Sequence, residues 1–298
     1  MRILKKTNIN FLKYSKLAAT ISISFLTISI ISVFFVRGLN YGIDFKGGVL
    51  VQVRFENSIT TAELRSIFAQ NQMGDAIIQK SNETNEFLIR LEKPEGSENI
   101  REKISNILGS VENNSFEIRK AEQVGPKIGR ELRKKALLAI ISALFVIGIY
   151  ITIRFQFRYA IGAVVALAHD VLFTLGIFSL AQIEISLSTI AAFLTIVGYS
   201  LNDTIVIYDR IRENIRVLKN EALPKVINKS LNETLSRTLI TSLTTFVAVF
   251  VLSFAPGEIK IFSIAMICGV IVGTYSSIYI ASPVVVYFHD KLRARKRS

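Results

Sequence analysis

The stretch that decides the fold is residues 190–208, Ile-Ala-Ala-Phe-Leu-Thr-Ile-Val-Gly-Tyr-Ser-Leu-Asn-Asp-Thr-Ile-Val-Ile-Tyr, an apolar run that contains one carboxylate, Asp203. About 20 apolar residues are enough for a helix to cross a bilayer. A carboxylate at membrane depth costs about 2.5–3.5 kcal/mol even on insertion scales, so it is by default a functional-site hypothesis. A membrane carboxylate that loses and regains a proton is typical of machinery driven by a proton gradient.

Five other apolar blocks resemble this one in a chain of 298 residues with mean hydropathy +0.43. The six predicted spans are 17–36, 136–153, 159–181, 188–208, 238–255 and 261–288. Between the first two lies a polar stretch, 37–135, long enough for a small folded domain. The apolar core of the first block is too long for the h-region of a cleaved signal peptide, and Val33-Phe-Phe-Val-Arg37 is no small-residue cleavage site, so we interpret the block as an uncleaved anchor. The sequence therefore predicts an α-helical multispan membrane protein with one soluble domain.

The net charge of +13 is unevenly distributed. Basic residues are in excess in the N-terminus 1–16, the 154–158 turn, segment 209–237 and the tail 289–298, whereas the charges of 37–135 nearly balance. This is the positive-inside pattern. It predicts that both termini are cytoplasmic and that the soluble domain is periplasmic. Because topology already explains the charge, nucleic-acid binding is not expected.

The soluble domain has an alternating pattern of strands and helices. Strands are predicted at 49–55, 76–80, 87–91 and 115–120, with helices from Thr60 or Thr61 to Gln70 and over 98–108. The order β-α-β-β-α-β is the ferredoxin-like split pattern, which by itself assigns no chemistry. The glycines of Tyr41–Gly48 permit a tight entry turn, but no phosphate loop and no nucleophile–base pair is present.

Two further charged residues accompany Asp203 in the spans. Arg237 begins the fifth span at a depth similar to that of Asp203, and Asp170 lies near the middle of the third span beside His169. A carboxylate beside a guanidinium can act as a proton switch, pairing when deprotonated and releasing the arginine when protonated. The alternative for Asp203 is a permanent helix–helix contact, for Asp170 a static pair with His169, and for Arg237 a snorkelling side chain.

Small residues recur at every fourth position of the last span: Ala265, Gly269, Gly273, Ser277 and Ala281. This stripe predicts close helix packing centred on Gly269, Gly273 and Ser277, and Pro283 predicts a kink beyond it. Segment 209–237 has apolar residues at helical spacing among basic ones, which predicts an interfacial helix on anionic lipid or a partner.

Metal and redox chemistry are not expected. The one cysteine, Cys268, lies in the last span, so the soluble domain has no disulfide. The two histidines, His169 and His289, are far apart and lack the spacing of zinc ligands. No cofactor is indicated, and the chain is not expected to be an enzyme.

Seven ordered motifs resemble the SecF branch of the SecD/SecF family of bacterial protein-export membrane proteins. They are Tyr-Gly-Ile-Asp-Phe-Lys-Gly-Gly (41–48), Val-Gly-Pro-Lys-Ile-Gly (124–129), Ala-His-Asp-Val (168–171), Gly-Tyr-Ser-Leu-Asn-Asp-Thr-Ile-Val (198–206), Asp-Arg-Ile-Arg-Glu-Asn (209–214), Ser-Leu-Asn-Glu-Thr-Leu-Ser-Arg-Thr-Leu (230–239) and Gly-Thr-Tyr-Ser-Ser-Ile (273–278). The resemblance runs from about Leu39 to the C-terminus.

The resemblance implies six spans similar to half of a resistance–nodulation–division transporter, in the bacterial inner membrane. It implies SecD as partner, association with the SecYEG channel, contact with exported preproteins, and use of the proton-motive force to complete their translocation. It also implies that Asp203 and Arg237 are the proton-coupling pair. Two other functions stay open: a scaffold that stabilises the translocon, and half of a small-molecule/proton antiporter, for which six spans are few.

Overall fold

The structure is a computed structural model that describes residues 7–81, 84–91, 100–109, 111 and 114–295. The basic residues Arg2, Lys5 and Lys6, the predicted helix start at Glu98, and the basic tail residues Lys296 and Arg297 lie outside the described residues.

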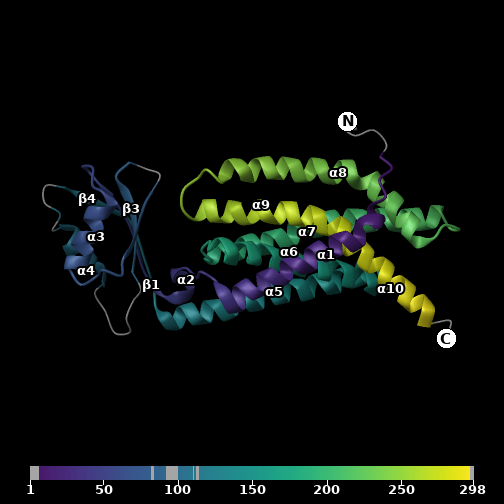
Figure 1. Cartoon of the computed structure of the whole chain (residues 1–298), viewed down its shortest axis with the longest axis horizontal. Helices are drawn as coiled ribbons and strands as arrows, with labels where there is room; N and C mark the ends of the chain where they lie inside the picture. Colours follow the sequence, from purple (N-terminus) through teal and green to yellow (C-terminus); the bar gives the residue numbers. More distant parts are fainter. Residues whose placement is uncertain (1–6, 82–83, 92–99, 110, 112–113, 296–298) are drawn as a thin grey trace.

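Within the described residues, six helical segments are long and apolar enough to cross a membrane, as predicted. The first, Phe11–Val36, comprises a 3-10 turn, α1 (Ser15–Ile31) and a π-helical turn (Ser32–Val36). The next four are α5 (Pro126–Arg154), α6 (Phe157–Ala181), α7 (Leu187–Val217) and α8 (Leu223–Leu252). The sixth joins α9 (Glu258–Ser276), a π-helical turn (Ser277–Ala281) and α10 (Ser282–Arg295). Figure 1 shows α10 leaving the direction of α9 around this turn, where Pro283 predicts a kink.

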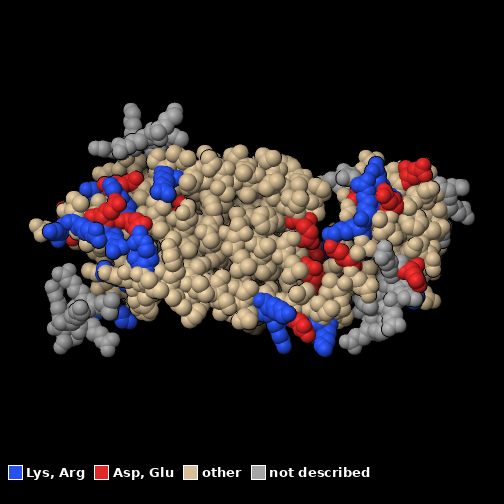
Figure 2. Space-filling view, turned by 180° about the vertical axis from the view of Figure 1, so that it is seen from behind, with Lys and Arg blue, Asp and Glu red and all other residues tan. Residues whose placement is uncertain are grey.

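The helices form one bundle, with the soluble domain at one end and both termini at the other (Figure 1). Helices α6 and α9 lie in its interior, because 56% of the apolar window of each is buried, against 17% for the first span and 11% for α5. In the space-filling view the middle of the bundle is a belt without exposed Lys, Arg, Asp or Glu, and the charged side chains gather beyond it (Figure 2). An apolar belt bounded by charge is the surface that a bilayer requires.

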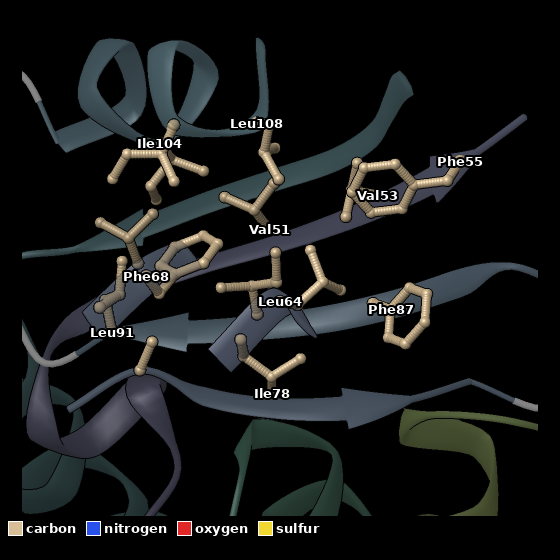
Figure 3. Close-up of a cluster of buried hydrophobic side chains, with 14 of the residues drawn as sticks. Val51, Val53, Phe55, Leu64, Phe68, Ile78, Phe87, Leu91, Ile104 and Leu108 are labelled. Carbon is tan, nitrogen blue, oxygen red and sulfur yellow. The ribbon is translucent and has the colours of Figure 1, made fainter. Parts of the chain in front are cut away.

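The soluble domain is a four-stranded antiparallel sheet in the order β2-β3-β1-β4. Its elements are β1 (Gly48–Phe55), α3 (Thr61–Gln70), β2 (Ile77–Lys80), β3 (Glu86–Leu91), α4 (Ile100–Gly109) and β4 (Phe116–Val124). The alternate residues of β1 pack with α3 and α4 into a core that includes Val51, Val53, Leu64, Phe87 and Ile104 (Figure 3). This confirms the predicted small α+β domain and its β-α-β-β-α-β order. Thr60 caps α3 with Glu63 in a reciprocal capping box.

The entry to the domain folds into a short helix, α2 (Ile43–Lys46), which rests on the start of α5. Gly47 follows with φ +85°, and a Cβ there would lie 2.9 Å from Cα of Pro126. A Cβ on Gly129, in α5, would lie 2.8 Å from the carbonyl oxygen of Phe45 in α2. The tight turn expected from these glycines is therefore also a site of backbone-to-backbone packing.

Segment 209–237 corrects one expectation, because it is not an interfacial helix. Helices α7 and α8 extend beyond the bundle and meet at a turn over residues 218–222. Ile211, one of the apolar residues at helical spacing in this segment, is fully buried against Ile227 and Leu231 of the facing helix. Arg210 joins the two helices through an ion pair with Glu233 at 2.7 Å. The apolar residues do line one face of a helix, but that face packs against a second helix of the same chain.

Candidate functional site: two buried carboxylates

Asp203 lies on α7 where that helix faces α8, and only 4% of it is exposed. The hydroxyl of Thr241 donates to its Oδ1 and that of Ser242 to its Oδ2, each at 3.5 Å. These are long contacts, and a charge-assisted O–H···O⁻ bond is about 2.5–2.7 Å. The hydroxyl of Ser242 lies 2.7 Å from that of Thr274 on α9. The three helices therefore supply Asp203 with polar neighbours that bind it only loosely.

Arg237 lies on the same side of α8 as this site. Its carbonyl accepts a hydrogen bond at 3.1 Å from the hydroxyl of Thr241, the residue that contacts Asp203. Its guanidinium acts on Asp203 electrostatically. Among the described residues, however, no ion pair within 4.0 Å joins the two side chains. The structure thus brings the predicted pair into one neighbourhood without a direct salt bridge.

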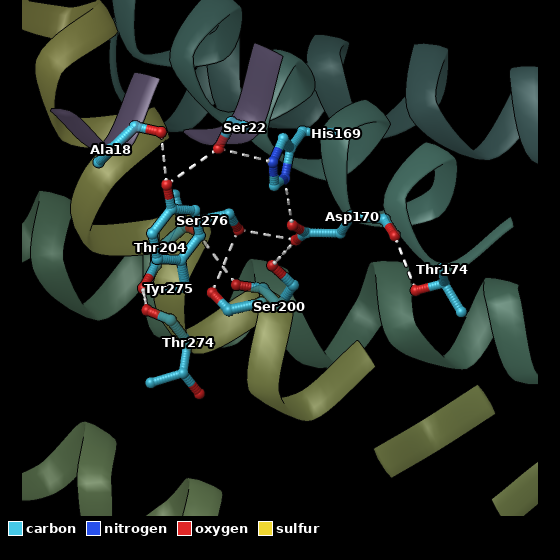
Figure 4. Close-up of polar contacts among 12 residues, drawn as sticks. Ala18, Ser22, His169, Asp170, Thr174, Ser200, Thr204, Thr274, Tyr275 and Ser276 are labelled. Carbon is cyan, nitrogen blue, oxygen red and sulfur yellow. Dashed lines mark hydrogen bonds and ion pairs between the residues drawn. The ribbon is translucent and has the colours of Figure 1, made fainter. Parts of the chain in front are cut away.

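Asp170 is held quite differently, in the interior of the bundle with no exposed surface. The hydroxyls of Ser200 on α7 and Ser276 on α9 donate to its Oδ2 at 2.6 and 2.8 Å. Its Oδ1 lies 3.1 Å from Nδ1 of His169, the preceding residue. Figure 4 shows these groups converging on the carboxylate from three helices. Asp170 thus accepts two short hydrogen bonds at Oδ2 and faces a ring nitrogen at Oδ1.

A row of polar groups continues from His169 to α1 (Figure 4). Nε2 of His169 lies 3.1 Å from Oγ of Ser22, and that Oγ lies 2.9 Å from the hydroxyl of Tyr275. The hydroxyl of Tyr275 donates to the carbonyl of Ala18 at 2.7 Å. The first helix is therefore tied to α6 and α9 by hydrogen bonds in its apolar middle.

The small-residue stripe explains how α9 comes so close to these groups. A Cβ on Gly269 would collide with the side chain of Ile196, and one on Gly273 would lie 2.9 Å from Cβ of Ser200. Both neighbours belong to α7, so the two glycines lie at the α7–α9 contact. Ser277, one turn further on, is buried and donates to the carbonyl of Thr274 at 3.0 Å. Close approach of α9 is what places Ser276 against Asp170.

Sequence reasoning singled out Asp203, Arg237 and Asp170, but it did not find the hydroxyls that hold Asp170 or those that lie one step further away. Ser200 and Ser276 donate to Asp170 itself. Ser22 bonds His169, Tyr275 bonds Ser22, and Thr274 bonds Ser242. Serine and threonine are common in apolar helices, where they usually bond to their own backbone, so no local pattern separates those that reach a carboxylate. Within the described residues, no group of three or more His, Cys, Asp or Glu side chains is placed to hold a metal ion.

A bundle of apolar helices that buries two carboxylates beneath a small α+β domain defines a multispan membrane protein built around ionisable groups. Two family descriptions match the chain: Protein export membrane protein SecD/SecF, C-terminal, over residues 103–291, and the SecD/SecF GG motif over residues 32–59. The chain belongs to the SecD/SecF family of protein-export membrane proteins.

Several named relatives resemble the chain along most of their length. The protein translocase subunit SecF of Magnetococcus marinus is 46% identical over 95% of this chain and 93% of its own. That of Calditerrivibrio nitroreducens is 45% identical over 97% and 96%. Among solved structures, the crystal structure of SecDF, a translocon-associated membrane protein from Thermus thermophilus, has a TM-score of 0.83 at 36% identity. The match covers 95% of this chain but only 39% of that longer one.

Proposed function

We propose that this chain is the SecF-type subunit which, with SecD, uses the proton-motive force to complete translocation of preproteins through SecYEG. The relatives that match nearly its whole length are named protein translocase subunits, which supports a transport role and not catalysis. The observation that carries the proton coupling is Asp203, a buried carboxylate in the bundle with only long hydrogen bonds.

In the proposed topology, the membrane is the bacterial inner membrane, the termini are cytoplasmic and the soluble domain is periplasmic. Arg154 ends α5, Arg158 lies in the first turn of α6, and Arg210 lies on the part of α7 that extends beyond the bundle. These parts of the helices lie at the end of the bundle opposite the soluble domain (Figure 1). An excess of Lys and Arg on short loops marks the cytoplasmic side.

Two observations support the proposed partners: the SecDF chain is longer than this one, and this chain has exposed apolar side chains. It corresponds to 39% of the SecDF chain, so a SecD-like partner would supply the remainder of that assembly. Side chains of α5 and α8 such as Leu138, Phe145, Leu243 and Val251 are more than half exposed. These surfaces are available to lipid, to SecD and to the SecYEG channel, and the soluble domain is available to the exported chain.

In the proposed mechanism, proton binding changes the contact between α7 and α8. Deprotonated Asp203 carries a negative charge that attracts the guanidinium of Arg237 and the hydroxyls of Thr241 and Ser242. Protonated Asp203 is neutral and loses that attraction. Because the existing hydrogen bonds are long, little has to be broken when the helices move. A gradient across the membrane would then drive repeated cycles of this movement.

Release of a preprotein on the periplasmic side, measured with and without a proton gradient, tests this function. We expect Asp203→Asn to assemble normally, to release slowly and to lose its response to the gradient. The matched control is Asp209→Asn, which removes an exposed carboxylate of the same helix that pairs with Arg154 at 3.2 Å. Its gradient response should persist.

Normal, gradient-dependent release by Asp203→Asn would contradict the motor and favour the scaffold function. The close contact of α9 with α7 at Gly269 and Gly273 is the observation that supports the scaffold. In that case Gly273→Leu, which forces these helices apart, would abolish export by disrupting the complex while Asp203→Asn would not.

A further inference from the structure

The His169–Asp170 pair carries an inference that does not depend on Asp203. Both residues are buried, with 5% and 0% exposure, and an ionisable pair at this depth is costly unless its charges and hydrogen bonds are satisfied. The hydrogen bonds around it form one continuous row, and each hydroxyl in that row has a single hydrogen to donate. Counting these hydrogens fixes where protons must be.

The carbonyl of Ala18, at the end of this row, can only accept a hydrogen bond. Tyr275 gives its hydrogen to this carbonyl, so Ser22, at 2.9 Å, must donate to the hydroxyl of Tyr275. Ser22 then has no hydrogen left for Nε2 of His169, 3.1 Å away, and accepts from it. Nε2 of His169 therefore carries a hydrogen.

The other ring nitrogen, Nδ1, requires a second hydrogen between His169 and Asp170. Nδ1 lies 3.1 Å from Oδ1 of Asp170, and if the imidazole were neutral and the carboxylate ionised, both atoms would be acceptors. A hydrogen must lie between them. The pair is thus either a carboxylic acid beside a neutral imidazole or a carboxylate beside an imidazolium. In both forms it holds one extra proton and has no net charge, as burial favours.

We propose that His169 and Asp170 form a second proton-binding site, whose proton sets the direction of the hydrogen bonds that join α1 to α6 and α9. The inference goes beyond the proposed function, since it concerns a different carboxylate and stands whether or not Asp203 couples a gradient to export.

Loss of the shared proton to water would leave the pair with one negative charge. The remaining ring hydrogen then belongs on Nδ1, where it is donated to the carboxylate of Asp170. Nε2 becomes an acceptor, and Ser22 turns its hydrogen from Tyr275 to His169. The hydrogen bond between Ser22 on α1 and Tyr275 on α9 is lost, while the bond between α1 and α6 remains.

Among the described residues, α1, α7 and α9, which bond to this pair, carry few other charged side chains near it. On α1 the charged residue is Lys16, in the first turn of that helix and six residues before Ser22. Helix α7 presents Ser200 and, three residues later, Asp203, and α9 presents Tyr275 and Ser276. A negative charge on the pair would therefore be stabilised by the two serine hydroxyls and disfavoured by an ionised Asp203.

The chain suits a direct test, because it has only two histidines, His169 and His289. Nitrogen-15 histidine in the full-length chain in lipid vesicles gives solid-state NMR shifts that distinguish the two neutral tautomers and the imidazolium. A His289→Gln variant identifies the signals of His169. As pH is raised from about 5 to about 9, loss of the shared proton should change His169 from an Nε2–H form to the Nδ1–H tautomer.

Three variants test whether this change of tautomer at His169 arises from a proton shared with Asp170. Asp170→Asn should remove it, because the amide can donate to a bare Nδ1 and lock the Nε2–H tautomer at every pH. Thr174→Val should retain it, since that hydroxyl donates only to the backbone carbonyl of Asp170, at 2.8 Å. Asp203→Asn should also retain it, which separates this site from the proposed export function.

A wild-type His169 that keeps one form throughout the range would overturn the proposal. So would the same change of tautomer in Asp170→Asn, because the proton would then not be shared with that carboxyl group.

Discussion

The two membrane carboxylates illustrate how differently one residue type is used within one bundle. Asp170 accepts hydrogen bonds of 2.6 and 2.8 Å from two serines, whereas the contacts of Asp203 are both 3.5 Å. Short, charge-assisted bonds fix a side chain and its helices, and long ones leave both free to rearrange. The same chemical group can therefore tie helices together at one depth and permit movement at another.

Arg237 gives a prediction at this scale. Since no ion pair within 4.0 Å joins it to Asp203 among the described residues, its contribution is a nearby positive charge and not a bidentate contact. Arg237→Lys should therefore keep most of the gradient-dependent release, and Arg237→Ala should slow it by about tenfold, or about 1.4 kcal/mol. Lys225→Ala, on the same helix and paired with Glu221, is the control and should be unaffected. Equal loss in both Arg237 variants would indicate that the guanidinium geometry matters.

At the scale of elements, the contact between α2 and α5 depends on glycine. A Cβ on Gly129 would lie 2.8 Å from the carbonyl oxygen of Phe45 and 2.9 Å from its carbonyl carbon, both backbone atoms that cannot move alone. Gly129→Ala should destabilise the protein by about 1–3 kcal/mol. Gly198→Ala meets nothing within 4 Å and should be neutral or more stable by about 0.5–1 kcal/mol. Thermal unfolding in detergent compares the two, and equal melting temperatures would contradict this account.

Elements were predictable from sequence to the extent that their signal is local. Apolar length predicts the six spans, and alternation predicts the strands of the soluble domain. Periodicity shows that Ile211 has a covered face but not what covers it, and the structure shows helix α8 where lipid was expected. The serines that bond Asp170 come from α7 and α9, and His169 is bonded in turn by Ser22 of α1, so no stretch of sequence contains these groups together.

At the scale of the whole molecule, the soluble domain and the bundle meet at the loop between α6 and α7. Glu184 of that loop pairs with Arg90 of β3 at 2.6 Å. Ile185 exchanges backbone hydrogen bonds with Asn40 and Gly42, at 2.8 and 2.9 Å. Asp44 accepts from the backbone of Leu187 at 2.8 Å. The domain is thus attached to the bundle by contacts as well as by the chain.

This junction gives a dependence on pH. Burial raises the pKa of Glu184 above its ordinary 4.5, the nearby carboxylates of Glu258 and Asp44 raise it further, and Arg90 opposes them. The folded protein therefore binds this proton more tightly than the unfolded chain does. The stability that Glu184 contributes is complete below the unfolded pKa and is lost as pH rises through the folded one. The melting temperature of the wild type, measured relative to that of Glu184→Gln, should therefore fall as the pH rises from the unfolded to the folded pKa of Glu184. A relative stability that rises with pH would contradict the assignment.

The attachment of the α6–α7 loop has a mechanical consequence. The chain enters the soluble domain from the first span and leaves it into α5, and two such supports leave a body free to swing about the line that joins them. The contact of Arg90 with Glu184 of the loop, and those of Asn40 and Gly42 with Ile185, add a third support. With two chain connections and this third contact, the soluble domain cannot rotate about any axis while all three are held. Rotation of the domain therefore requires either that this third contact opens or that α6 and α7 move with it.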